Sequence, residues 1–152
     1  MCALEVSLEV AVERIPTVRA VITNTSNVKT ITTIVWNSPL DDSALDAGVF
    51  GLVVLPTAQE LQAPGPSGNG LVPLREDLAE FRPGSSVSHS IPVRASWIPR
   101  QGQYCRVQAR GQWTAVWEKP ISELSDEEIK EAVTKGDLGA SFASNIVEIR
   151  LT

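Results

Sequence analysis

The sequence predicts an all-β protein, an antiparallel β-sandwich that carries one short inserted helix. Leu4 to Val12 alternates apolar and polar residues, which is the period of a strand with one buried and one solvated face. Val28 to Trp36 is rich in β-branched residues and stops before Pro39, which cannot continue a strand ladder. More short segments of this kind follow, separated by turn residues.

The strands are expected in the following order. After Leu4–Val12, the segment Val18–Thr23 alternates again and predicts a two-strand meander, and Val28–Trp36 is the third strand. Gly48–Leu55 is the fourth, with Gly51 a candidate β-bulge. Further strands are expected at Ser86–Val93, Gln103–Ala109, Gln112–Trp117 and Asn145–Leu151.

Loops, turns and one helix occupy the other segments. Gln62–Gly70 is rich in Gly and Pro and predicts a loop between strands. A helical turn is expected at Arg75–Leu78 and a tight turn at Arg82–Ser85. Ser125 followed by Glu128 is a capping-box pattern, which predicts a helix that ends at Gly136.

Length and composition set limits on the class of protein. A chain of 152 residues is expected to form one sandwich domain over residues 1–152. The net charge of −5 argues against a nucleic-acid partner, which would require a basic face. No apolar run is long enough to span a membrane, and Glu5, Glu9 and Glu13 interrupt the pattern of a signal peptide. An intracellular location, or a chain that begins after processing, is therefore expected.

Two cysteines allow at most one disulfide. Cys105 is interpreted as a small buried residue of a strand, and pairing with Cys2 remains open. The sequon at Asn24 would accept a glycan only in a secretory setting.

Five short segments resemble a known family in order and residue type. They are Thr23-Asn24-Thr25, Asn37-Ser38-Pro39-Leu40-Asp41, Leu78 with Phe81-Arg82-Pro83-Gly84-Ser85, Gly102-Gln103-Tyr104-Cys105-Arg106-Val107 and Ser144-Asn145-Ile146-Val147-Glu148-Ile149. Together they are similar to the amino-terminal domain of fungal deuterolysin-type zinc proteases.

This resemblance implies a β-sandwich pro-segment that assists folding and keeps a protease latent until it is cleaved. The catalytic domain, with its His-Glu-x-x-His motif, has no counterpart here, because the chain contains one histidine. The resemblance therefore assigns no catalytic residue of the family to this chain. The Gln62–Gly70 loop and the Ser122–Gly136 helix also exceed the usual connections of the family.

The sequence holds few candidates for catalysis. His89 is alone, so no histidine-based metal site is expected, although a Ser–His–acid triad cannot be judged from spacing. Cys105 alternates with Tyr104 and Arg106, which places it on the opposite strand face, as a packed residue. Gly-x-Tyr resembles the tyrosine corner of an immunoglobulin-like sandwich, the architecture predicted here, although Cys105 is one residue too early for the immunoglobulin disulfide.

Acidic and aromatic residues provide two further candidates. Asp41, Asp42 and Asp46 share a loop and are interpreted as turn carboxylates rather than calcium ligands. Four tryptophans either fill the core or line a ligand pocket, and two of them are expected on one strand face. These candidate binding residues are Trp36, Trp97, Trp113 and Trp117, of which Trp113 and Trp117 are the two that share a face.

Two functions of different classes are compatible with these features. The first is a stand-alone, pro-domain-like binding module, an inhibitor or folding helper of a metalloprotease, whose Leu61–Pro73 loop places Pro64 and Pro66 in a partner cleft. The partner is a protease or another protein, a small-molecule ligand remains open, and strand edges allow a homodimer.

The second function is a small metal-free and cofactor-free enzyme, of the cyclase or isomerase type. The tryptophans would shape its pocket, and Tyr104 or a buried carboxylate, Glu118 or Asp137, would move protons. The binding module is the preferred hypothesis.

Overall fold

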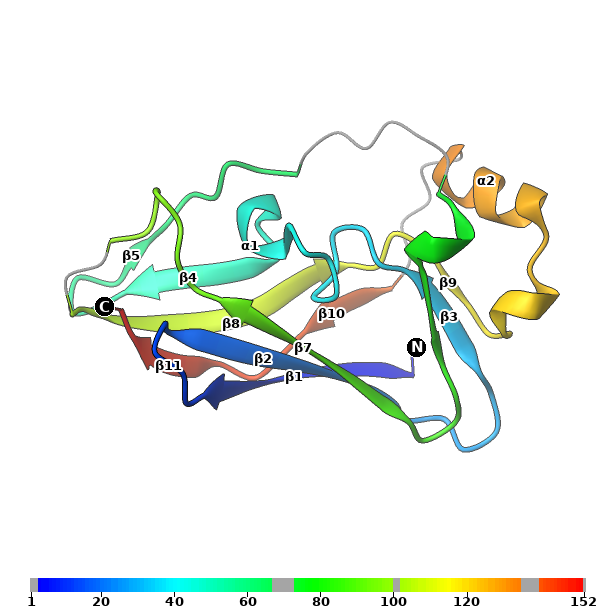
Figure 1. Ribbon diagram of the computed structural model, residues 1–152, viewed down its shortest axis with the longest axis horizontal. Coiled ribbons are helices and arrows are strands. Elements are labelled where there is room, and N and C mark those ends of the chain that lie inside the picture. Colours follow the sequence, from blue (N-terminus) through cyan, green and yellow to red (C-terminus); the bar gives the residue numbers. More distant parts are fainter. Residues whose placement is uncertain (1–2, 67–72, 100–101, 135–139, 152) are drawn as a thin grey trace.

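Two antiparallel β-sheets face each other in the computed structural model, with a smaller sheet and a helix at one end (Figure 1). The structure describes residues 3–66, 73–99, 102–134 and 140–151. The predicted all-β sandwich with a short helix is confirmed. Two clusters of buried apolar side chains form its interior, a large one between the sheets and a small one beneath the helix.

The first sheet has the order β1-β2-β7, and the second has the order β10-β8-β4-β5, with β11 also paired to β8. The third sheet has the order β6-β3-β9. The strands of the first sheet are β1 (Leu4–Ala11), β2 (Thr17–Asn24) and β7 (Ser86–Pro92). Those of the second are β4 (Phe50–Val54), β5 (Gln59–Glu60), β8 (Tyr104–Gln112), β10 (Ser141–Ala143) and β11 (Val147–Arg150). Those of the third are β3 (Ile31–Ile34), β6 (Leu78–Phe81) and β9 (Val116–Trp117), and the helices are α1 (Ala44–Ala47), α2 (Asp126–Thr134) and the 3₁₀ turns Arg75–Asp77 and Ile121–Glu123.

The strand alternation and the helix cap that the sequence predicts are both present in the structure. In β1 the side chains of Leu4, Val6 and Leu8 are buried while their neighbours are exposed. The N–H of Glu128 donates to Ser125 Oγ, and the N–H of Ser125 donates to Glu128 Oε1, so the capping box of α2 forms in both directions. The expected helical turn, tight turn and first two strands are also confirmed.

Several expectations about the strands are wrong. The third strand covers only Ile31–Ile34, because the chain bends at Asn27–Val28 before it and turns at Trp36–Asn37 after it. Gly51 is not a bulge, since it pairs in register with Gln108. Its missing side chain makes room for Arg110, because a side chain there would begin 2.8 Å from Arg110 Cζ. The expected strand Gln112–Trp117 is divided between the end of β8 and the two-residue β9.

Asn24 ties the first sheet to the neighbouring turns. Its side chain is fully buried, and Nδ2 donates to the carbonyl oxygens of Lys29 at 2.8 Å and Phe81 at 2.9 Å. Oδ1 accepts the N–H of Ser26 at 2.9 Å. A glycan on Nδ2 would displace these contacts, so the sequon is not compatible with glycosylation of the folded chain.

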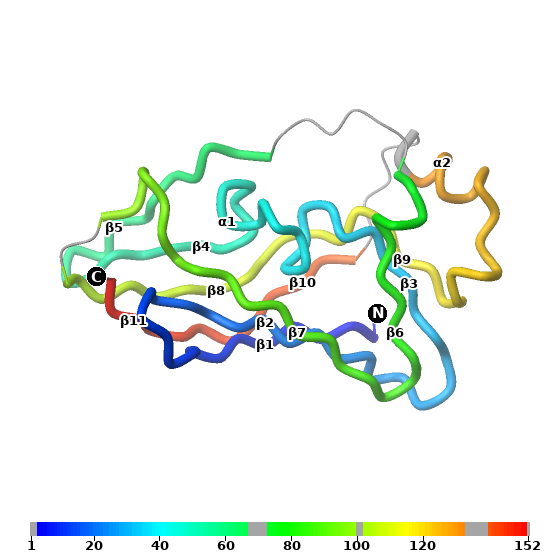
Figure 2. The backbone as a smooth tube through the Cα atoms, in the orientation of Figure 1, coloured from blue at the N-terminus to red at the C-terminus, as the bar shows by residue number. Residues whose placement is uncertain are grey.

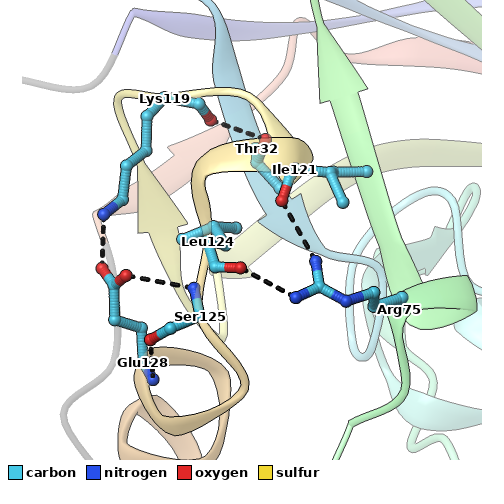
Figure 3. A network of polar contacts seen from close by, with 7 residues as sticks. All are labelled: Thr32, Arg75, Lys119, Ile121, Leu124, Ser125 and Glu128. Carbon is cyan, nitrogen blue, oxygen red and sulfur yellow. Dashed lines mark hydrogen bonds and ion pairs between the residues drawn. The ribbon is translucent and has the colours of Figure 1, made fainter.

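The segment that carries α2 is held to the rest of the fold by polar contacts (Figure 3). The Arg75 guanidinium donates to the carbonyl oxygens of Ile121 at 3.1 Å and Leu124 at 2.8 Å. Lys119 pairs with Glu128 at 2.5 Å, and the Lys119 carbonyl accepts the hydroxyl of Thr32 at 2.8 Å. These polar contacts add to the packing of Ile129 and Leu124 in the small apolar cluster beneath the helix.

Replacing Arg75 by Ala should lower the free energy of unfolding by about 1 kcal/mol, because two carbonyl groups lose a charged donor. Urea denaturation measures the loss, and limited proteolysis should show faster cleavage around α2. Arg82→Ala is the matched control, since Arg82 is exposed and has no side-chain partner among the described residues. Equal stability of Arg75→Ala and Arg82→Ala would contradict this role.

Candidate binding surface

Two clefts lie on either side of β11. The larger has a volume of about 410 Å³ and lies beside the start of β8. The smaller, of about 200 Å³, lies between the β1–β2 hairpin and the end of β11. Figure 2 shows this hairpin and β11 at the same end of the molecule as the C-terminus. The larger cleft is lined by Leu55, Pro56, Gly102, Gln103, Tyr104 and Glu148, and the smaller by Val10, Ala11, Val12, Glu13, Arg14, Pro16, Thr17, Ile149 and Arg150.

Arg150 connects the two clefts. It lines the smaller cleft, and a side chain at Gly102 of the larger cleft would begin 3.7 Å from its Nη2 atom. Gly102 has a φ of +64°, so its backbone conformation also favours glycine. The two clefts therefore form one continuous surface, which we call the β11-end surface and define by Val10, Val12, Ile15, Leu55, Pro56, Tyr104, Glu148 and Arg150.

The hydrogen-bonding direction of β1 explains why this end is open. Pairing of β1 with β2 places Ala3 opposite Thr25, whose N–H donates to the Ala3 carbonyl, so alternate residues from Leu4 to Val10 direct their backbone groups away from β2. At Leu8 these groups meet Asn145, whose Oδ1 accepts the Leu8 N–H at 2.7 Å and whose Nδ2 donates to the Leu8 carbonyl at 3.1 Å. Two residues further, at Val10, the smaller cleft begins.

Exposed apolar side chains gather on the β11-end surface. Val10 is 51% exposed, Val12 fully exposed, Ile15 36% and Tyr104 50%. Val28, 83% exposed, lies at the far end of β2 and is remote from both clefts. Clustered apolar groups next to concave surface are typical of a binding site rather than of scattered surface residues.

The charges of this surface are largely uncompensated. Glu148 lies 3.9 Å from Arg106, a distance that makes only a weak pair. Arg14 and Arg150 form no ion pair with the residues that the structure describes. A ligand with apolar groups and a carboxylate that reaches Arg14 or Arg150 would therefore match this part of the surface, which Glu13 and Glu148 border.

The tryptophans do not form one pocket. Trp113 is fully buried in the large cluster and packs on Phe142 with ring centroids 4.9 Å apart. Trp36 and Trp117 are half-buried against the small cluster, and Trp97 donates its indole N–H to Asp46 at 2.8 Å. The expected shared face of Trp113 and Trp117 is wrong, because the chain leaves β8 before Trp113.

The candidates for proton transfer are separated in the same way. Tyr104 lines the larger cleft. Glu118 is exposed rather than buried, and its hydrogen bond with Lys29 holds the pKa of its carboxyl below the usual value. Asp137 lies outside the described residues. Pro64 and Pro66 are exposed.

The other candidate residues have structural contacts. Asp41 accepts the N–H groups of Asn37 and Ser43, and His89 lies 3.6 Å from Asp42. Within the described ranges, no three His, Cys, Asp or Glu side chains are grouped to hold a metal ion. None of the described helices has the length and apolar character that a membrane crossing requires.

Comparison with known proteins gives the family. The immunoglobulin-like domain matches residues 3–151. The chain belongs to the immunoglobulin-like domain family. This assignment agrees with the β-sandwich described above and is broader than the deuterolysin pro-domain, which no match names.

One relative is an uncharacterized secreted protein of the fungus Arthroderma benhamiae. It is 29% identical over 135 residues, an alignment that covers 83% of this chain and 64% of the relative. This chain therefore spans less than two thirds of the length of that relative.

Sequence reasoning found Tyr104 but missed the rest of the β11-end surface. The signal available was the apolar end of the first hairpin, where Val10 and Val12 close the alternating pattern and Ile15 follows in the turn. Their meeting with β11 depends on pairing between residues more than a hundred positions apart, which periodicity does not encode.

Cys105 should be chemically silent in the folded chain. Burial raises the pKa of its thiol to about 11, so the thiolate is scarce at neutral pH. In a Cys2→Ser background, which removes the thiol outside the described residues, a disulfide reagent should label Cys105 only after unfolding. Rapid labelling of the native chain at neutral pH would show that this thiol is accessible.

Proposed function

We propose that this immunoglobulin-like domain is a protein-binding module that receives an extended segment of a partner on the β11-end surface. The observation that carries the proposal is that three exposed apolar side chains, Val10, Val12 and Tyr104, line two neighbouring clefts. The larger cleft presents Leu55, Pro56 and Tyr104 to the partner, and the smaller presents Val10 and Val12.

The partner segment should be apolar with at least one carboxylate. Its apolar side chains would cover Val12 and Tyr104, and its carboxylate would pair with Arg150, which has no ionic partner among the described residues. A bidentate pair with an arginine adds orientation as well as affinity. Apolar anchors next to a charged rim are the usual arrangement of a protein interface.

The finer proposal is that the partner is a metalloprotease of the deuterolysin type, which the domain inhibits or helps to fold. Its support is the resemblance of the five sequence segments, together with a relative that is called secreted and comes from a fungus. An extracellular setting would bring the domain and such a protease together.

The contacts of those five segments are mainly structural. Asn24 holds turns, Ser38 caps the loop before α1 by bonding the Val35 carbonyl at 2.7 Å, and Asn145 joins two sheets. The resemblance thus supports a shared architecture, and two of the segments also contribute Tyr104 and Glu148 to the β11-end surface.

The arrangement of the tryptophans does not favour the small-enzyme hypothesis. It required the four tryptophans to surround one ligand, but they are divided between two cores: Trp97 and Trp113 pack in the large cluster, and Trp36 and Trp117 pack in the small one. Neither of the two clefts described above is lined by a tryptophan.

Val12→Glu should weaken binding to a deuterolysin-type protease at least tenfold, about 1.4 kcal/mol, because a charge would be buried against the partner. Titration of the domain into the protease with a peptide substrate measures inhibition, and calorimetry measures the complex. Val28→Glu is the matched control, since it places the same change on another highly exposed valine, remote from both clefts.

Two outcomes separate the parts of the proposal. Absence of inhibition and of a complex removes the protease as partner. The surface itself is then tested by selecting displayed peptides that bind the domain. The selected peptides should bind the Val28→Glu variant as tightly as they bind the natural chain, and should not bind the Val12→Glu variant. Peptides that bind all three equally would overturn the surface assignment.

A further inference from the structure

The two outer strands of the first sheet differ in how their edges are protected. β1 is closed at its centre by Asn145, and its solvent face carries Glu5 and Glu9. The outer strands β5, β6, β9, β10 and β11 of the other sheets have four residues or fewer. Short, charged or covered edges are the ways in which proteins prevent unwanted strand pairing.

β7 has none of these protections. It has seven residues, Ser86–Pro92, and pairs with β2 on one side only. Its single ionisable side chain is His89. Val87, on the same side of the strand as the buried Ile91, is still 37% exposed, which shows that the strand margin is accessible.

The register of β7 identifies its free backbone groups. The N–H of Val93 donates to the Pro16 carbonyl, and the Ser85 carbonyl accepts the N–H of Asn24, so odd-numbered residues of β7 are bonded to β2. The backbone groups of Ser86, Ser88 and Ser90 therefore face away from β2. No described residue hydrogen-bonds to these groups.

We propose that β7 pairs antiparallel with β7 of a second copy of this chain, about a two-fold axis at Ser88. This register sets Ser88 opposite Ser88 and Ser86 opposite Ser90 in the other copy. In each copy, Ser86, Ser88 and Ser90 each offer one backbone N–H donor and one backbone C=O acceptor. This register pairs all of these groups, which gives six hydrogen bonds between the two copies. A shift of two residues leaves one residue of each copy unpaired.

The side chains favour a second copy as the occupant. The sequence Ser86-Val87-Ser88-His89-Ser90 is nearly symmetric about Ser88, so a two-fold axis opposes serine to serine on the outer face and valine to histidine on the inner face. No like charges are opposed, and the two sheets merge into one of six strands, β1-β2-β7 from each copy. Pro92 lacks an N–H and limits the pairing to these residues.

A single strand pair buries little surface, so the dimer should be weak and dependent on concentration. Analytical ultracentrifugation of the natural chain should show a monomer–dimer equilibrium in the tens to hundreds of micromolar. A chain that stays monomeric over that range would overturn the proposal. The binding test at the β11-end surface is independent of this result, because β7 contributes no residue to that surface.

A charge pair tests the two-fold register itself. Ser88→Lys and Ser88→Asp should each be monomeric, since the axis opposes like charges. An equal mixture of the two variants should dimerise again, because lysine then faces aspartate.

Ser7→Lys is the matched control. Ser7 lies in the same row across the sheet as Ser88, through Val21, but on the closed edge of β1. It should dimerise like the natural chain. Dimers of both single Ser88 variants, or a mixture that stays monomeric, would contradict pairing through β7.

Discussion

The side-chain amide of Asn145 determines which parts of this sandwich are closed and which are open. It bonds both backbone groups of Leu8, with Oδ1 2.7 Å from the nitrogen and Nδ2 3.1 Å from the oxygen. Asn145 is itself positioned by Ser144, whose Oγ accepts the Ala109 N–H of β8 at 2.9 Å. One residue thus substitutes for a strand between β1 and the second sheet, because it satisfies the same two groups that a neighbouring strand would.

The consequences extend to both proposed surfaces. Since the bridge reaches only Leu8, the end of β1 at Val10 separates from β11 and leaves the smaller cleft, which Arg150 connects to the larger one. The same bridge occupies the middle of the β1 edge, whereas no described residue bonds to the outward backbone groups of β7, so the first sheet has one interrupted edge and one bare edge. Partner binding and self-pairing would thus use different margins of the same sheet.

Local patterns predicted the local structure of this chain well. The alternation of Leu4–Ala11 and the Ser125–Glu128 capping box depend on neighbouring residues, so the sequence contains all that they require. The failures depend on distant contacts: β6 forms a strand because β3 offers it a ladder, and Trp113 is separated from Trp117 because β8 ends at Gln112. The same holds for the candidate site. Tyr104 was identified from the sequence by its residue type, whereas Arg150 was identified only from its position between the two clefts in the structure.

Amide hydrogen exchange at low micromolar concentration, where the chain is monomeric, tests this arrangement of edges most directly. The Leu8 amide should be protected through Asn145, while the outward amides of Val10 and Ser88 should exchange rapidly. Asn145→Ala should remove the protection of Leu8 and leave that of Ala20, in the middle of β2, largely unchanged. Strong protection of Val10 and Ser88, or a Leu8 amide unaffected by Asn145→Ala, would contradict the account.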